Sequence, residues 1–331
     1  MPANLTPQYK EAEERYRAAR TPAEKLVALE EMLSIIPKHK GTEHLQADIK
    51  RKIAKLRDGD GKKDAQSKRG LEYNVEKEGA GQVTLVGPPN SGKSSLLSTL
   101  SKAHAEIGEY PFTTHKPQPG MMPYEDIRIQ IVDLPPISEE FTEAWVVAIA
   151  RNSDAVLLVL DAADPDVLSQ IETTISLLEK FKLRLCGWEK PCEDDGTGLT
   201  SRKTLMVLNK MDMPDAAYNL EIVREFFGES FPVYPVSSET ESGLDVLKTD
   251  IFKMLDIVRV YTKMPGKPAD KESPFVLANG STLLDLASMI HKDFAQKLKF
   301  AKIWSHQKFE GQMVSRDYVL ADGDIIELHV Q

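Results

Sequence analysis

The stretch that decides the fold is Gly87-Pro88-Pro89-Asn90-Ser91-Gly92-Lys93-Ser94. It matches the pattern G-x-x-x-x-G-K-[ST], follows the apolar run VTLV and precedes the helix-like run SSLLSTLSKA. In this context the backbone N–H groups of the turn and of the next helix form a cradle for phosphate groups. We expect Lys93 to reach the β- and γ-phosphates and the Ser94 hydroxyl to bind Mg²⁺, and we include Ser95 in the nucleotide-binding set. The alternative is a flexible glycine loop without a ligand.

Short apolar runs alternate with helical stretches on the carboxyl side of this loop. The runs read VTLVG, IRIQIVDL, AVLLVLDA, TLMVLNK and FPVYPVS. This alternation is typical of βαβ units, in which a mostly parallel sheet is covered by helices on both faces. The sequence therefore predicts an α/β fold with a doubly wound P-loop domain.

Asp133 ends a strand in which Ile127, Ile129 and Ile131 alternate with polar residues or valine. Its carboxylate should lie at the carboxyl edge of the sheet, where doubly wound folds bind ligands. An aspartate after a strand is more often a cap or turn residue. The phosphate loop upstream favours a metal role, so we expect Asp133 to hold Mg²⁺ through water.

The run Asn209-Lys210-Met211-Asp212 follows the apolar run TLMVL and predicts a reader of the base. A carboxylate at Asp212 accepts hydrogen bonds from N1–H and the 2-amino group of guanine, whereas adenine offers neither in that arrangement. We expect Asn209 to brace the neighbouring loops and the stem of Lys210 to cover the base. The ordered set makes an ATP-using P-loop enzyme, such as a kinase, the less favoured hypothesis.

Two further segments complete the predicted site. Ser237, Ser238 and Glu239 follow another strand and should present backbone N–H groups to the guanine O6. Between the phosphate loop and Asp133 lies YPFTTHKPQPG at 110–120, which is too rich in proline for a helix. We expect this segment to close over the γ-phosphate and Thr114 to complete the Mg²⁺ shell; the alternative for Thr114 is an ordinary loop threonine.

Composition changes along the chain predict several domains. The expected division is a helical arm at 1–57, a linker at 58–80, the P-loop domain at 81–260, a linker at 261–273 and a small α+β domain at 274–331. The arm carries helix-start signals such as Thr21-Pro22-Ala23-Glu24. Within the first linker, residues 58–70 are almost without apolar side chains, and the second linker is rich in proline, glycine and charge.

Charge is spread unevenly over this chain of 331 residues. The net charge is -9, yet residues 1–70 hold 16 Lys and Arg against 11 Asp and Glu. A basic arm on an acidic body is one way to meet a polyanion with one end only, although such charges can also merely solvate helix faces. No apolar stretch approaches the roughly 20 residues that span a bilayer, so we expect no membrane association and a cytoplasmic protein. Cys186 and Cys192 are not expected to form a structural disulfide or a metal site.

Taken in order, the motifs GPPNSGKS, YPFTTHKPQPG, DLPP, NKMD and VSSETESGL resemble those of the Obg-like translation-associated GTPases. With the helical arm and the tail, the chain resembles the developmentally regulated GTP-binding proteins, whose β-grasp tail is called a TGS domain. The resemblance implies a GTP-driven switch that acts on ribosomes or RNA through the arm and the TGS domain. Because family members with an asparagine where Asn90 stands often use potassium at the phosphates, it also implies K⁺ as a second cation.

One departure from the family pattern concerns the second switch. The family reads Asp-x-Pro-Gly, and this chain reads Asp133-Leu134-Pro135-Pro136. The glycine N–H normally bonds the γ-phosphate, whereas proline has no N–H and a fixed φ that stiffens the hinge. The next residue, Ile137, is apolar and cannot orient the attacking water.

These features leave two hypotheses of function. The first is a Mg²⁺-dependent GTPase that converts GTP to GDP and phosphate, with slow intrinsic hydrolysis and a regulatory partner or cation that supplies missing charge stabilisation. The second is a non-switching GTP/GDP-binding scaffold whose hydrolysis is impaired by Pro136.

Overall fold

The computed structural model describes residues 15–16, 22–35, 49, 75–101, 116–140, 142–190, 196, 198–305 and 309–330. The chain forms two compact units, Met1–Glu72 and Tyr73–Gln331. In the first unit, α2 (Pro22–Ile35) begins at the residue that follows Thr21, as the helix-start signal predicts. Its residues Leu29 and Met32 are buried.

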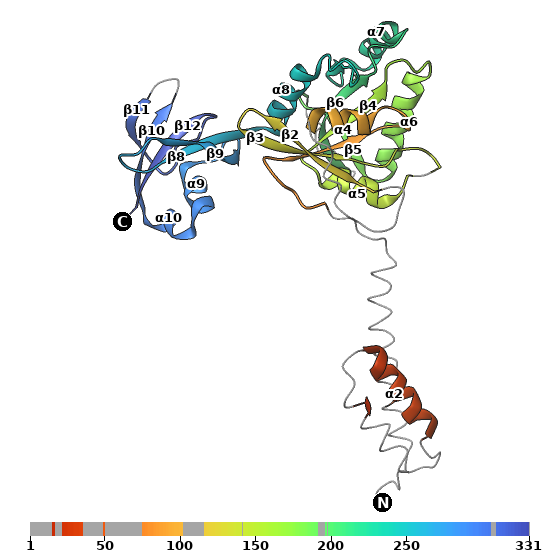
Figure 1. The fold of residues 1–331 in the computed structure, drawn as a ribbon, viewed down its shortest axis with the longest axis horizontal. Coiled ribbons are helices and arrows are strands. Elements are labelled where there is room, and N and C mark those ends of the chain that lie inside the picture. The colour runs from red at the N-terminus through yellow and green to blue at the C-terminus, as the bar shows by residue number, and fades with distance from the viewer. Residues whose placement is uncertain are drawn as a thin grey trace, which may run out of the picture. The chain divides into compact units, whose positions relative to one another are not determined.

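The second unit contains two sheets (Figure 1). The elements of its first part are β1 (Gln82–Val86), α4 (Lys93–Ser101), β2 (Gln118–Tyr124), β3 (Ile127–Asp133), α5 (Ala144–Asn152), β4 (Ala155–Asp161), α6 (Val167–Lys180), β5 (Leu183–Gly187), β6 (Thr200–Asn209), α7 (Ala216–Phe227), β7 (Val233–Pro235) and α8 (Leu244–Leu255). The strand order is β2-β3-β1-β4-β6-β5, with β7 also paired to β6. All of these pairs are parallel except the β2–β3 hairpin, so the prediction of a mostly parallel α/β sheet is confirmed.

The larger sheet has helices on both faces because its central strands are apolar on both sides. In β4, Leu157 and Leu158 are both fully buried, and alternation directs them into different cores. One core contains residues of α5, α6 and α7, and the other contains residues of α4 and α8. This arrangement places the carboxyl ends of β1, β3, β4 and β6 along one edge, where the loops that carry the motifs emerge.

The smaller sheet follows α8 directly. Its elements are β8 (Ile257–Lys263), β9 (Ala269–Ala278), α9 (Leu283–Ile290), α10 (Lys292–Lys297), β10 (Leu298–Ser305), β11 (Phe309–Val314) and β12 (Asp324–Val330). The strand order is β11-β10-β12-β8-β9, with only β12 and β8 parallel. Apolar residues of one sheet face, including Val260, Ile303 and Ile326, share a core with Leu286 of α9. The outcome is the small α+β domain that the sequence predicts.

The smaller domain begins earlier than the sequence division expected. Residues 261–273, interpreted as a linker, form the end of β8, a turn and the start of β9. The turn holds Pro265, Gly266 and Pro268, and Gly266 has a φ of 75°. Proline, glycine and charge therefore mark a hairpin here, because a tight turn needs the same residues as a linker.

Two smaller expectations can be compared with the described residues. Cys186 on β5 is disulfide-bonded, so the expectation of no disulfide is wrong; the loop-like composition after the strand did not indicate the bond. Within the described part of the chain, no helix combines the length and the apolar character needed to cross a membrane.

Candidate functional site

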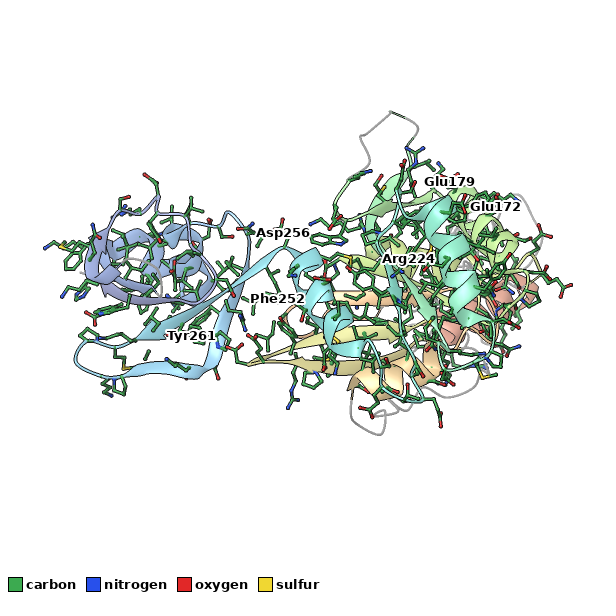
Figure 2. The ribbon with its side chains drawn as sticks, turned by 90° about the horizontal axis from the view of Figure 1, so that it is seen from above. Glu172, Glu179, Arg224, Phe252, Asp256 and Tyr261 are labelled. Atoms are coloured by element: carbon green, nitrogen blue, oxygen red, sulfur yellow. The ribbon has the colours of Figure 1, made fainter. Side chains whose placement is uncertain are left out.

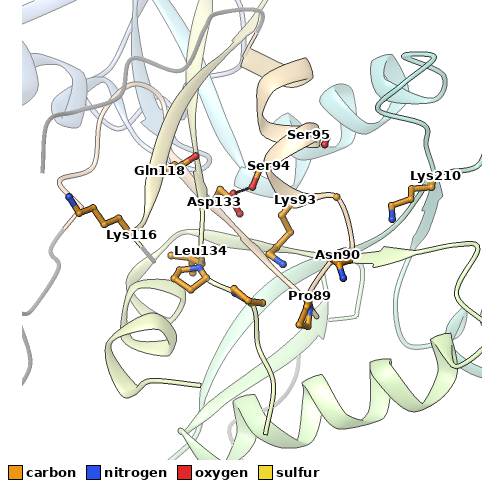
Figure 3. A pocket seen from close by; sticks show the side chains of 13 residues that line it. Pro89, Asn90, Lys93, Ser94, Ser95, Lys116, Gln118, Asp133, Leu134 and Lys210 are labelled. Atoms are coloured by element: carbon orange, nitrogen blue, oxygen red, sulfur yellow. Dashed lines mark hydrogen bonds between the residues drawn. The ribbon is translucent and has the colours of Figure 1, made fainter. Parts of the chain in front are cut away.

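The predicted phosphate loop borders a pocket at the carboxyl edge of the larger sheet (Figure 3). The pocket measures about 700 Å³. Its lining consists of Pro89, Asn90, Gly92, Lys93, Ser94, Ser95, Lys116, Gln118, Asp133, Leu134, Pro135, Pro136 and Lys210. Most of the residues predicted to bind phosphate and metal are thus gathered around one space. Asp212, Ser237, Ser238 and Glu239 lie outside this lining, and Thr114 lies outside the described residues.

Glycine is required twice in the loop between β1 and α4. Gly87 has a φ of 155°, and a Cβ there would lie 2.1 Å from the Val159 carbonyl oxygen. Gly92 has a φ of 86°, and a Cβ there would lie 2.3 Å from Asn209 Nδ2. The loop can approach β4 and the end of β6 this closely only because side chains are missing at both positions.

Replacing Gly92 with alanine should weaken binding of guanine nucleotides at least about tenfold, since the new methyl group displaces Asn209 or the loop. Gly280→Ala is the matched control. Gly280 has a φ of 84°, nearly that of Gly92, but a Cβ there meets no atom within 4 Å. Titration with a fluorescent guanine nucleotide compares the two variants, and equal affinities would show that the close approach of Asn209 does not matter.

Lys93 is the first residue of α4 and is buried, with 7% of its surface exposed. Its Nζ donates to the carbonyl oxygens of Gly87 at 3.1 Å and Pro88 at 2.8 Å, and to Ser91 Oγ at 3.4 Å. Burial lowers the pKa of the Lys93 amine to about 8, and the charge of Asp133 offsets this only in part. A buried cation held by neutral oxygens gains strongly from an anion placed beside it.

Ser94 and Asp133 meet at the other side of the pocket. Ser94 Oγ donates to Asp133 Oδ2 at 2.5 Å (Figure 3). The other carboxylate oxygen, Asp133 Oδ1, is buried without a hydrogen-bond partner. Burial raises the pKa of the Asp133 carboxyl, although the Ser94 hydrogen bond and the Lys93 charge oppose it. An orphaned buried carboxylate oxygen beside a hydroxyl is chemically suited to a hard cation.

Asn209 connects the phosphate loop to the loop after β7. Its Nδ2 donates to the carbonyl oxygens of Ser91 and Gly92, both at 3.4 Å. Its Oδ1 accepts from both the backbone N–H and the hydroxyl of Ser238 at 3.0 Å. The side chain is 1% exposed, so it acts as a buried brace between two loops.

Asp212 and Lys210 follow Asn209 at the end of β6. Asp212 Oδ1 accepts from Ser237 Oγ at 2.5 Å, and Lys210, with a φ of 64°, lines the pocket. Lys210 Nζ lies 2.6 Å from Asp161 Oδ2, an ion pair that the sequence analysis missed. The signal was present, because Asp161 ends the apolar run AVLLVLD much as Asp133 ends its own strand. Glu239 is exposed.

The segment after Asp133 is tied to the phosphate loop. The Ile137 N–H donates to the Gly87 carbonyl oxygen at 3.0 Å, and the Leu134 N–H donates to the Leu85 carbonyl oxygen at 3.4 Å. Leu134 and Ile137 are each 2% exposed. Pro136 therefore lies in a backbone run that is anchored on both sides, while its own nitrogen has no hydrogen to donate.

Comparisons with known proteins agree with this arrangement. Residues 82–191 match the family model described as a 50S ribosome-binding GTPase, and residues 258–330 match that of the TGS domain. A GTP-binding protein of Methanocaldococcus jannaschii is 28% identical over 93% of both chains. Developmentally-regulated G-protein 1 of Arabidopsis thaliana is 29% identical over 92% of this chain and 90% of its own. Developmentally-regulated GTP-binding protein 1 of Xenopus laevis is 28% identical over 92% of this chain and 98% of its own.

Among solved structures, a GTP-binding protein from Pyrococcus horikoshii OT3 is 17% identical, with a TM-score of 0.48 over 76% of this chain and 100% of that one. The family models and the full-length relatives carry the conclusion. This chain combines a P-loop GTPase domain with a C-terminal TGS domain, and its homologues are developmentally regulated GTP-binding proteins.

Proposed function

We propose that the protein binds GTP with Mg²⁺ and hydrolyses it slowly to GDP and phosphate. The observation that carries this proposal is a buried Lys93, whose Nζ donates to neutral oxygens, near the Ser94–Asp133 pair, in which Asp133 Oδ1 has no partner among the described residues. A bound triphosphate supplies an anion to the first and, with its metal, a cation to the second. A metal-bound phosphate chain therefore satisfies both groups at once.

The donor set in the pocket fits Mg²⁺. Ser94 and Asp133 offer a hydroxyl and carboxylate oxygens, and Thr114 is proposed as a further ligand. Among the described residues no group of three or more His, Cys, Asp or Glu is arranged around a metal site, so phosphate oxygens and water must complete the shell. This is the ordinary mode for Mg²⁺, which uses few protein ligands and neutralises charge on the phosphates.

The remaining residues of the site are assigned from the phosphate end of the nucleotide to the guanine base. The residues proposed to cradle the phosphates are Gly87, Pro88, Pro89, Asn90, Ser91, Gly92, Lys93, Ser94 and Ser95. Asn90, with a φ of 61°, lines the pocket, and we propose that its side chain contacts K⁺ at the phosphates. Asp212 reads guanine, the stem of Lys210 covers it, and Asn209 braces the neighbouring loops. Ser237, Ser238 and Glu239 are proposed to face the guanine O6, although the N–H groups of Ser237 and Ser238 already donate to the Ser242 carbonyl oxygen and to Asn209 Oδ1.

Hydrolysis proceeds by in-line attack of water on the γ-phosphate, and this chain is expected to be slow at it. Ile137 is apolar and 2% exposed, so it neither orients nor deprotonates the water. Pro136 offers no N–H to the γ-phosphate. Catalysis therefore rests on positioning and on cations, with Lys93 as the buried charge beside the phosphates.

The second candidate is a GTP/GDP-binding scaffold that does not switch. It is favoured by the anchoring of the Pro136 segment, since the Ile137 N–H already bonds the Gly87 carbonyl oxygen. In this case both GTP and GDP fill the pocket, and loss of the γ-phosphate changes the backbone from Asp133 to Ile137 very little.

Two measurements distinguish the two candidates: the rate of single-turnover GTP hydrolysis and the affinities for GTP and GDP. Both are made with Mg²⁺ in a potassium buffer, on the native chain and on Pro136→Gly. The enzyme is expected to hydrolyse GTP and to prefer it over GDP in native form, with the glycine variant about tenfold faster because it regains an N–H donor. If the native chain binds both nucleotides alike and only the variant hydrolyses, the scaffold is correct. Equal rates in sodium would refute the potassium role.

We further propose that the protein acts on a ribosome or RNA in the cytoplasm, with regulation by a protein partner. In the TGS domain, Phe300, Lys302 and Trp304 alternate with the buried residues of β10 and so lie on the sheet face away from α9. Lys263 Nζ lies 3.9 Å from the Trp304 ring centroid on that face. Aromatic rings interleaved with lysines suit stacked bases and phosphates. We retain as a proposal the division into a helical arm, a linker, a P-loop domain and a TGS domain, with the TGS domain beginning at Ile257.

A further inference from the structure

The pocket contains three lysines, and two of them are already engaged. Lys93 donates to oxygens of its own loop, and Lys210 is paired with Asp161 at 2.6 Å. Lys116 also lines the pocket and is partly buried. Within the described part of the chain it has neither an ion pair nor a hydrogen bond. In a protein with 51 acidic residues, an unpaired lysine at the edge of a phosphate pocket is notable because many carboxylates compete for such cations.

Lys116 lies just before β2, on the side of the pocket that β2 and β3 form. Gln118 of β2 pairs with Asp133 of β3 in an antiparallel ladder. Lys116 comes two residues before Gln118, and Pro135 and Pro136 come just after this ladder on the other strand; all of these residues line the pocket. Figure 3 shows Lys116 and Lys93 on opposite sides of Leu134, with the Lys116 amine turned away from Lys93. A lysine side chain is long and flexible, so its amine can reorient toward the pocket by rotation about side-chain bonds.

From this geometry, and resting on the proposed GTP binding, we propose that Lys116 binds the γ-phosphate of GTP in place of the N–H that Pro136 lacks. A lysine is a point charge on a flexible stem, so it can reach a phosphate without the fixed geometry of a backbone donor. The γ-phosphate is the part of GTP that GDP does not have. Lys116 therefore determines the preference for triphosphate over diphosphate, and it stabilises charge on the γ-phosphoryl oxygens during hydrolysis.

The test compares Lys116→Gln, Lys116→Arg and the control Lys180→Gln, an exposed lysine at the end of α6. Affinities are measured for GDP and for a non-hydrolysable GTP analogue, together with single-turnover rates. All variants should bind GDP within about twofold of the native chain. Lys116→Gln should lose about tenfold in analogue affinity and ten- to a hundredfold in rate, because it removes one charge contact to the γ-phosphate. Lys116→Arg should keep most of both, and Lys180→Gln should match the native chain.

Repeating Lys116→Gln in the Pro136→Gly variant tests whether Lys116 replaces the missing N–H. In Pro136→Gly the restored N–H shares the γ-phosphate, so Lys116→Gln should cost less there than in the native chain. Analogue-to-GDP affinity ratios that are unchanged by Lys116→Gln in the native background would overturn the inference, even if hydrolysis is normal. Failure of the native chain to bind either nucleotide would instead overturn the proposed function. If the native chain binds GTP but does not hydrolyse it, the analogue-to-GDP affinity ratio still tests the role of Lys116.

Discussion

Asp212→Asn is expected to lower the affinity for GTP by about a hundredfold, or about 2.7 kcal/mol, while weak binding of ATP stays unchanged. The carboxylate lies three residues after the end of β6 and accepts a hydrogen bond from the Ser237 hydroxyl at 2.5 Å. A guanine base presents two donors to it. Asparagine puts its own NH₂ group against one of those donors, so one hydrogen bond is lost and a donor faces a donor.

Competition of unlabelled GTP and ATP against a labelled guanine nucleotide measures this change. Asp215→Asn is the matched control, since Asp215 is also an exposed aspartate, lies three residues away and makes no side-chain cap bond at the start of α7. Its GTP affinity should stay within about twofold of native, as for a surface charge outside the site. Native GTP affinity in Asp212→Asn would mean that another residue reads the base.

The parts of the site that could be predicted from the sequence depend on the order of neighbouring elements along the chain. A glycine loop after a strand and before a helix places Lys93 and Ser94 without any long-range information. Asp133 and Asn209 were placed by a general property of parallel sheets, whose carboxyl ends share one edge. The brace from Asn209 to the phosphate loop then follows, because Gly92 leaves room for it.

The features that the sequence did not predict depend on pairing between distant segments. The Lys210–Asp161 ion pair joins residues 49 apart, and no spacing rule connects them. The segment 110–120 was expected at the γ-phosphate, but the proline-rich run did not single out Lys116 as a lining residue of the pocket. The start of the TGS sheet at Ile257 was missed because the β8–β9 turn has the composition of a linker.

Another long-range set of contacts joins the two sheets of the second unit. Arg259 on β8 donates to Asp322 at 2.7 Å and to Asp126 at 2.7 Å, and it also bonds Glu125, all from a side chain that is 11% exposed. Asp126 and Glu125 form the turn of the β2–β3 hairpin. The Tyr261 hydroxyl also bonds Asp126. The hairpin that carries Asp133 at one end is thus fastened to the TGS domain at the other.

An aromatic layer supports this cluster from the side of α8. Phe252 stacks on Tyr124 with centroids 4.9 Å apart, and the Arg259 guanidinium lies 4.9 Å from the Phe252 ring centroid. Figure 2 shows Phe252, Asp256 and Tyr261 along the path from α8 into β8. Burial opposes ionisation of Asp126, but hydrogen bonds from Tyr261 and Arg259 outweigh it and lower the pKa of that carboxyl. The cluster is therefore held by a fully ionised carboxylate at neutral pH.

Arg259→Ala is expected to lower the free energy of unfolding by about 3 kcal/mol, since it leaves carboxylates facing one another without a cation. Urea denaturation measures the loss, and limited proteolysis should show earlier cleavage near Asp256, between α8 and β8. Arg224→Ala is the control, because the Arg224 side chain is 47% exposed and its ion pair with Glu221 is long at 3.5 Å. That variant should change stability by no more than about 0.5 kcal/mol.

Arg259→Lys distinguishes charge from geometry in the same cluster. Lysine keeps the positive charge but cannot make the forked contact to Asp322 or lie flat on Phe252, so it should recover only part of the lost stability. Full recovery would mean that the charge alone fastens the hairpin. Equal stability of Arg259→Ala and Arg224→Ala would mean that the Arg259 ion pairs do not hold the TGS domain to the β2–β3 hairpin. The contact between the two sheets would then rest on the Tyr261–Asp126 hydrogen bond and on Ile257 and Val276, which pack against the core of the larger domain.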